Sequence, residues 1–285
     1  MQYVIANSAA EALAALLEAD GKAIVCAGGS DVIVDRKIGK ISPEVLVDVS
    51  RAEDMMGIKI EGDKIVIGAA ATLTEVATHP EIRKMYPSLC KGCGTVGSLQ
   101  IRNSATLVGN VVSAQPAADG AVAVSVLDPV FTVLSKDGTR EVPMTEMYAG
   151  FGKSTVDHSC EVVTKVTIPV PADDEAAAFQ RLELRKSLSL PMLNAAAMVK
   201  VQDGKIVWAR ITMAPVGVGP VHAEVAEAYL VGKEMTDEVL AEAGKLALEN
   251  ANPRSNPLRG SREFRIDTLP VMVRRALEDC RAQLQ

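Results

Sequence analysis

The stretch from Gly94 to Asp119 constrains this chain more than any other, because it places glycines, small polar side chains and one carboxylate between apolar segments. Gly97 and Gly109 permit backbone conformations and close approaches that a Cβ atom would block, so amide N–H groups there can reach a ligand's oxygens. Asp119 follows as an acceptor for a hydroxyl or a ring N–H. The composition predicts either a ligand-binding loop or a glycine-rich packing corner.

A second glycine-rich segment favours the ligand-binding interpretation. Residues 27–31 read Ala-Gly-Gly-Ser-Asp and follow the apolar run from Ala23 to Cys26, which predicts a strand. Paired glycines at the end of a strand present successive amides to an anion such as a pyrophosphate. Neither standard nucleotide fingerprint is present, since no G-x-x-x-x-G-K-[ST] occurs and the G-x-G at Gly217 and Gly219 lacks a third glycine. Two separate glycine-rich loops therefore predict a dinucleotide site.

Together these segments resemble a known family. AGGSD, followed later by VGSLQIRNSATLVGN and PAAD, is similar to the FAD-binding medium subunit of the molybdenum hydroxylases, which include xanthine, nicotinate and aerobic CO dehydrogenases. FQRLELRKSLSLPMLNAAAMV and RGSREFRIDTLPVMVRRAL resemble the start and the end of the family's C-terminal domain. The resemblance extends over the whole chain.

The resemblance implies an α+β fold in two domains. We expect an FAD-binding domain at residues 1–171, with a small β-α-β subdomain at 1–57 and a larger α+β subdomain at 58–171. A C-terminal α+β domain at 172–285 is expected to carry a three-stranded antiparallel sheet and helices. The pair Pro169 and Pro171 independently predicts this boundary. Local patterns predict a capped helix after Ser8, a hairpin around 202–204, and later helices at 221–231, 237–250 and 268–284.

The resemblance also assigns contacts to FAD. Segment 25–32 would wrap the pyrophosphate, the second loop would line the cofactor, and Asp119 would accept a hydroxyl or ring donor. The full set is Val25, Cys26, Ala27, Gly28, Gly29, Ser30, Asp31, Val32, Gly97, Thr106, Leu107, Val108, Gly109, Asn110, Asp119, Val163 and Arg181. Arg181 is equally interpretable as a surface cation. Val108 stands where the family has glycine, so it would be strained if that position needs a positive φ.

Composition excludes several classes of function. Hydrophobic residues make up 48% of 285, enough for two cores, and the net charge of −6 with scattered Lys and Arg argues against nucleic-acid binding. No long apolar span or signal peptide is visible, so we expect neither membrane insertion nor export, and the five cysteines suit a reducing cytoplasm. Cys90-x-x-Cys93 lacks a second pair, so packing thiols are expected there and no metal site is predicted.

No catalytic residue is predicted, because the three histidines are scattered and no nucleophile elbow occurs. A flavin would carry the redox chemistry itself. The resemblance implies an electron-transfer subunit of a heterotrimer, with a molybdenum cofactor-binding large subunit and a small subunit carrying two-iron iron-sulfur clusters. Electrons would pass through FAD to NAD or another acceptor, and xanthine or another purine is the first substrate expected for the complex. A stand-alone flavin oxidoreductase and a nucleotide-binding or scaffold subunit without redox turnover remain alternatives, the scaffold supported only by Val108.

Overall fold

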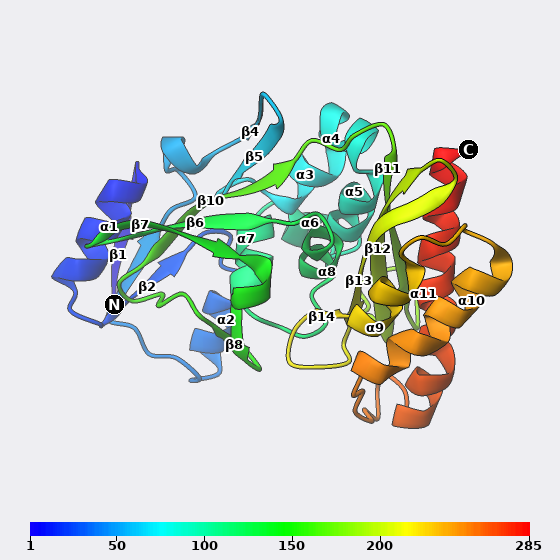
Figure 1. Ribbon diagram of the computed structural model, residues 1–285. Helices are drawn as coiled ribbons and strands as arrows, with labels where there is room; N and C mark the ends of the chain where they lie inside the picture. Colours follow the sequence, from blue (N-terminus) through cyan, green and yellow to red (C-terminus); the bar gives the residue numbers. More distant parts are fainter. The chain divides into compact units, whose positions relative to one another are not determined.

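The computed structural model describes residues 1–285 and divides the chain into two units, neither of which is continuous in sequence. The first unit comprises Met1–Val76, Leu99–Ala114 and Asp128–Pro169. The second comprises Ala77–Ser98, Gln115–Leu127 and Val170–Gln285. Figure 1 shows the elements of both, coloured along the chain.

The first unit begins with a small parallel sheet in the order β1-β3-β2, made of β1 (Gln2–Ile5), β2 (Ala23–Cys26) and β3 (Val45–Asp48). Helix α1 (Ala9–Glu18) starts after Ser8, whose Oγ accepts a hydrogen bond from the Glu11 N–H at 3.2 Å. The expected β-α-β unit is confirmed, and β1 adds a strand that the sequence analysis did not name. Helix α2 (Val32–Lys37) and the 3₁₀ helix η1 (Glu53–Met55) complete this part.

A five-stranded antiparallel sheet forms the rest of the first unit, in the order β4-β5-β10-β6-β7. Its strands are β4 (Ile58–Glu61), β5 (Lys64–Gly68), β6 (Val130–Ser135), β7 (Gly138–Pro143) and β10 (Val162–Pro169). Helix α1 packs against β6 and β10 as well as against β2 and β3, so one helix serves both sheets. The shorter elements are η2 (Met144–Glu146), β8 (Tyr148–Gly150), β9 (Lys153–Ser154), α6 (Leu99–Arg102) and α7 (Leu107–Val112). Helix α3 (Leu73–Thr78) spans the end of the unit's first segment.

The second unit is built on an antiparallel sheet of β11 (Glu175–Leu182), β12 (Leu193–Gln202), β13 (Lys205–Ala214) and β14 (Val221–His222). The predicted hairpin joins β12 to β13 through Asp203 and Gly204, both at positive φ. The sheet has four strands rather than three, because Val221 and His222 pair with β13 instead of beginning a helix. That helix, α9 (Glu224–Leu230), therefore starts later than the sequence suggested.

Helices cover both faces of this sheet. The side chains of Leu193, Ala195 and Ala197 join the core formed with α9, α10 (Asp237–Leu246) and α11 (Arg262–Leu284). On the opposite face, Asn194 contacts the first residue of α8 (Asp119–Ser125), and α5 (Pro87–Gly94) packs against β11. Strand β12 is consequently buried on both faces over seven consecutive residues, 193–199. Helix α4 (Pro80–Met85) and the 3₁₀ helix η3 (Ala247–Asn250) complete the unit.

Helix α11 begins at Arg262, six positions before the predicted start at 268. The Oγ of Ser261 accepts a hydrogen bond from the Phe264 N–H at 3.2 Å and caps the helix there. Pro270 lies inside the helix, where α10 packs closely: a Cβ atom on Gly244 would lie 2.4 Å from the Pro270 carbonyl oxygen. None of the helices combines the length and the apolar composition needed to cross a membrane.

Candidate cofactor-binding site

The loop between β2 and α2 leaves a row of backbone amides unpaired. None of the N–H groups from Ala27 to Val32 donates a hydrogen bond, whereas the next one, that of Ile33, bonds the Gly29 carbonyl at 3.1 Å. Gly29 has a φ of +69°, in the left-handed region that glycine adopts without strain. Because these residues are half-buried or exposed, an anion with several oxygens can reach the free amides, so the row has the properties of an anion site. We call residues 27–32 the amide cradle.

The two glycine-rich segments meet at Gly28. A Cβ atom at this position would lie 2.0 Å from the Ser104 carbonyl oxygen and 2.6 Å from the Ala105 nitrogen. Ser104 and Ala105 immediately precede Thr106, which begins the second predicted loop. The structure therefore brings the amide cradle and the start of the second loop into direct contact.

The second loop turns into a short helix, and the strain considered for Val108 is absent. Thr106 caps α7, since its Oγ1 accepts a hydrogen bond from the Gly109 N–H at 2.9 Å. Val108 lies within α7 without a positive φ and is 4% exposed. A valine is acceptable in helical backbone, and its side chain contributes to the core. The reason for considering a scaffold that has lost FAD is thereby removed.

Neighbouring segments hold the second loop in place. The Leu73 N–H donates to the Ala105 carbonyl at 2.8 Å, and Thr72 forms an isolated bridge with Thr106. The Thr74 hydroxyl donates to Asn103 Oδ1 at 2.7 Å. Asn103 of the QIRN motif thus braces this loop by a bond to the start of α3.

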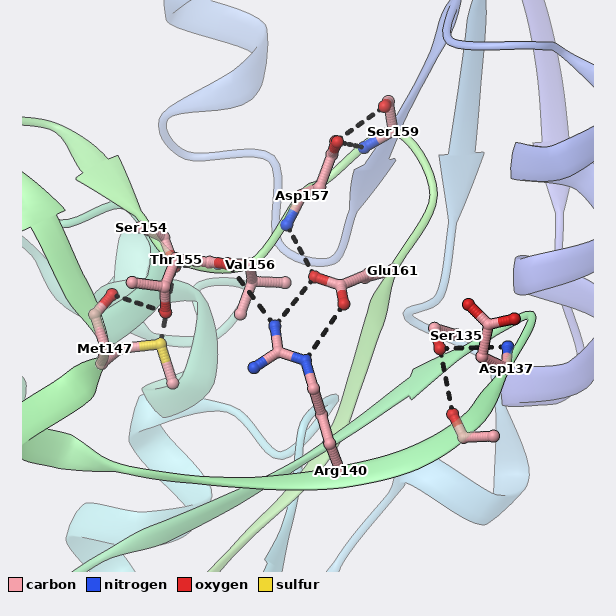
Figure 2. Close-up of polar contacts among 11 residues, drawn as sticks. Ser135, Asp137, Arg140, Met147, Ser154, Thr155, Val156, Asp157, Ser159 and Glu161 are labelled. Atoms are coloured by element: carbon pink, nitrogen blue, oxygen red, sulfur yellow. Dashed lines mark hydrogen bonds and ion pairs between the residues drawn. The ribbon is translucent and has the colours of Figure 1, made fainter.

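A polar network around Glu161 supports strand β2 through the neighbouring loop at 157–161. The Arg140 guanidinium donates to both carboxylate oxygens of Glu161 at 3.0 and 3.1 Å, and Glu161 also accepts from the Asp157 N–H at 2.9 Å (Figure 2). Burial opposes ionisation of Glu161, but the bonds from Arg140 and from the Asp157 amide hold its pKa below the ordinary value. The loop fixed in this way presents the His158 carbonyl to the Val25 N–H at 3.4 Å. The network therefore positions the strand that leads into the amide cradle.

Val163 lies in the middle of the larger sheet. It is 8% exposed, pairs with Val133 of β6, and stands beside a bulge between Val163 and Lys165. Its strand, β10, packs against α7. The structure thus connects Val163 to the second loop through the packing of these two elements.

Asp119 and Arg181 form a buried ion pair in the second unit. Arg181 Nε lies 3.0 Å from Asp119 Oδ1, and the same oxygen accepts from Asn194 Nδ2 at 2.9 Å. The guanidinium also contacts Glu183 at 3.0 Å and donates to the Ser189 carbonyl. Burial raises the pKa of Asp119 to about 6, although the Arg181 charge and the Asn194 bond oppose that rise. The side chain of Arg181 is only 6% exposed, so the alternative of a surface cation is wrong.

The remaining predicted residues fall into the two units separately. Gly97, in the second unit, has a φ of +52°, a conformation that favours glycine. The cradle, the second loop at 106–110 and Val163 belong to the first unit, whereas Gly97, Asp119 and Arg181 belong to the second. The carbonyls of Ser104 and His158 make structural contacts beside the cradle that the sequence did not predict. For Ser104 the only signal was the glycine at position 28, and for His158 there was none.

The thiols are structural in character. Cys90 and Cys93 are free and buried in α5, and burial raises the pKa of both. Burial and the nearby Asp48 raise the pKa of Cys26, in the predicted cofactor segment, to about 11. Thiols held neutral in this way are weak nucleophiles and weak metal ligands. No group of three or more His, Cys, Asp or Glu side chains is placed to hold a metal ion.

Comparisons with known proteins agree with this geometry. Residues 1–171 match the family described as the FAD binding domain in molybdopterin dehydrogenase, and residues 177–280 match the CO dehydrogenase flavoprotein C-terminal domain. The chain is 34% identical over 219 residues to the nicotinate dehydrogenase FAD-subunit of Eubacterium barkeri, covering 76% of this chain and 74% of that protein. It is 30% identical to the carbon monoxide dehydrogenase medium chain of Afipia carboxidovorans, covering 97% and 95%.

A solved structure shares the whole fold. The carbon monoxide dehydrogenase from Hydrogenophaga pseudoflava, in a form lacking the Mo-pyranopterin moiety of its cofactor, contains a chain that superposes with a TM-score of 0.94 at 26% identity. The match covers 99% of this chain and 98% of that one. The resemblance found in the sequence and the α+β fold are confirmed. The chain therefore belongs to the family of FAD-binding flavoprotein subunits of the molybdopterin dehydrogenases, which are oxidoreductases.

Proposed function

We propose that this chain is the electron-transfer flavoprotein of a heterotrimeric molybdenum hydroxylase. The observation that carries the proposal is the amide cradle, whose six consecutive N–H groups from Ala27 to Val32 make no hydrogen bond of their own. A pyrophosphate offers several oxygens to such a row, and Gly28 places the row directly against the second loop. The local geometry fits the cofactor that the family binds.

Within the first unit, the residues proposed to hold FAD have distinct tasks. Residues 25–32 wrap the pyrophosphate, with the amides of the cradle at 27–32 as its donors, and the capped turn from Thr106 to Asn110 lines the cofactor. Val163 contributes from β10. The bound FAD supplies the capacity to accept and release one or two electrons, so the chain needs no acid or base of its own for that chemistry.

Asp119 is proposed as an acceptor from the second unit. Both of its donors, Arg181 and Asn194, bond to Oδ1, and no donor of this unit contacts Oδ2. The free oxygen suits a hydroxyl or ring N–H of the cofactor. Arg181 then orients Asp119 rather than neutralising phosphate, because its guanidinium is already occupied by Asp119, Glu183 and Ser189. Gly97 is proposed to allow close backbone approach.

The names of the relatives support the proposed partners. The relatives are named as the FAD-subunit of nicotinate dehydrogenase and as medium chains of carbon monoxide dehydrogenases. We propose a molybdenum cofactor-binding large subunit and a small subunit carrying two-iron iron-sulfur clusters as partners in the cytoplasm, with NAD or another acceptor receiving the electrons. A nitrogen heterocycle such as a purine or nicotinate is the proposed substrate of the complex, since the relative at 34% identity acts on nicotinate by name and a xanthine dehydrogenase subunit is 25% identical.

The test is purification from the native host without a denaturing step. Absorbance at about 450 nm, expected of any bound oxidised flavin, should accompany the chain, and mass spectrometry should find a large molybdenum-containing and a small cysteine-rich polypeptide with it. A colourless chain that neither binds added FAD nor brings partners would contradict the proposal. Flavin without partners would instead favour a stand-alone flavin oxidoreductase.

A further inference from the structure

The start of α11 and the segment before it concentrate positive charge. From Ala251 to Asp267 the chain carries four arginines against two acids, Glu263 and Asp267. We call Arg254, Arg259, Arg262 and Arg265 the arginine cluster. The segment is well anchored, because the Asn252 N–H donates to the Val216 carbonyl at 2.8 Å and the Arg262 N–H donates to Ser255 Oγ at 2.9 Å. The arginines are thus attached to a fixed backbone.

Arg265 is buried without a counter-charge. The residue is 4% exposed, and its guanidinium donates only to the carbonyls of Pro215 and Arg259, each at 3.3 Å. Its Nε is buried and has no hydrogen-bond partner. Neither Arg265 nor Arg259 forms an ion pair with any carboxylate. Burying a charge without a partner of opposite sign is costly, so a folded protein seldom keeps one.

The helix itself adds to the imbalance. α11 is 23 residues long, and its N-terminus, where Arg262 and Arg265 lie, carries the positive end of the helix dipole. Cations are unfavourable at that end and anions are favourable. Burial and the charges of Arg259 and Arg254 lower the pKa of Arg265, and no acid opposes them. Three independent features therefore call for negative charge at one place.

We propose that the arginine cluster binds a phosphate-type oxyanion, either free phosphate or the phosphate group of a nucleotide. Guanidinium groups pair with phosphate through two parallel N–H···O bonds, and phosphate carries enough charge to offset several arginines. The cluster shares no residue with the amide cradle, since it belongs to the second unit and the cradle to the first. It does not depend on the chain's role in electron transfer.

The test measures binding of inorganic phosphate to the full chain saturated with FAD, by calorimetry at constant ionic strength with chloride as the reference anion. The double variant Arg254→Gln/Arg259→Gln should weaken phosphate binding by about tenfold or more, because it removes two guanidinium groups that would donate charged hydrogen bonds to the anion. Arg275→Gln is the matched control: it removes an exposed arginine from the same helix and should leave the affinity unchanged. FAD content should be equal in all three proteins.

A second arm uses ADP-ribose, which carries a pyrophosphate, to identify the source of the anion. Tighter binding of ADP-ribose than of phosphate, lost in the double variant, would assign the site to a nucleotide, and binding of phosphate alone would assign it to the free ion. Arg265→Lys keeps the charge but loses the planar fork and should also weaken binding. The proposal is overturned if neither probe binds in preference to chloride, or if the double variant binds as tightly as Arg275→Gln. The double variant decides the question even if Arg265→Lys fails to fold.

Discussion

Gly28 and Ser104 approach each other so closely that no side chain fits between them. A Cβ atom at position 28 would lie 2.0 Å from the Ser104 carbonyl oxygen, well inside any permitted contact. Backbone cannot yield here as a flexible side chain would, because Ala105 is itself bonded to Leu73. The contact therefore sets the separation of the amide cradle from the second loop, and it explains why glycine occupies position 28.

Gly28→Ala should abolish or strongly weaken FAD binding while the second unit remains folded. The added methyl group must push the cradle away from Ser104, so the two loops no longer present their groups together. The measurement is the ratio of flavin to protein after purification, with titration of added FAD. Gly150→Ala serves as the control, because a Cβ atom there meets nothing within 4 Å and its φ is not positive. Equal flavin content in both variants would show that the contact does not matter for the site.

Arg181→Met should destabilise the second unit by about 3 kcal/mol, because it leaves Asp119 buried without its cationic partner. The pKa of Asp119, raised by burial to about 6 from 3.8, should rise further without the guanidinium. When the pKa of a carboxyl is higher in the folded protein than in the unfolded chain, the free energy of unfolding falls as the pH rises through the range between the two pKa values. The loss in free energy of unfolding should therefore be larger at pH 8 than at pH 5, as measured by urea denaturation.

The control for this variant is Arg274→Met, which removes the partly exposed ion pair with Glu278 at 3.4 Å. Such pairs contribute about 0 to 1 kcal/mol, with little dependence on pH in this range. If Arg181→Met were as mild as Arg274→Met at both pH values, the buried pair would have no special role in stability.

Glu161→Ala should lower the stability of the first unit by about 1 to 2 kcal/mol, since it removes the acceptor for Arg140 and for the Asp157 amide. The lower end is expected because Arg140 is 43% exposed and solvent screens its charge. Release of the loop should also free the Val25 N–H from the His158 carbonyl, so FAD should dissociate several-fold faster. Stopped-flow loss of flavin absorbance measures this rate. Glu44→Ala, which breaks the exposed pair with Lys22, should change neither quantity.

Thiol labelling should distinguish Cys160 from the other cysteines. Cys160 is half-buried, whereas Cys26, Cys90, Cys93 and Cys280 are buried. Iodoacetamide should therefore add one label to the native chain and four more only after unfolding, as counted by mass spectrometry. Cys160→Ser should remove the native label. Modification of Cys90 or Cys93 in the folded protein would indicate an accessible, reactive pair and contradict their assignment as packing thiols.

The fold was largely predictable where local chemistry agrees with tertiary packing. Ser8 capped α1 as expected, and the turn at Asp203 and Gly204 joined the predicted hairpin. The misses have physical causes. β14 is two residues long and exists only because β13 offers an edge to pair with, and the early start of α11 depends on a serine cap followed by polar residues that show no apolar periodicity.

The contact between the two glycine-rich segments was predictable in part from their glycines, but the groups that support the segments were not. Paired glycines after a strand predicted a close backbone approach at this point, and Gly28 makes one, against the Ser104 carbonyl. The expectation at Val108 depended on an assumed positive φ, and the helix capped by Thr106 removed that requirement. Contacts made by carbonyl groups, such as those of Ser104 and His158, leave no trace in residue type. They could be found only once distant segments were placed together.

The free amides of the cradle bear on whether the chain must bind FAD in order to fold. Because none of its six amides takes part in the hydrogen bonds that hold the first unit together, water can satisfy them when no cofactor is present. The chain can then fold completely before it acquires FAD, and losing FAD need not unfold it. Maturation can accordingly load the flavin into a finished subunit, as a late and reversible step.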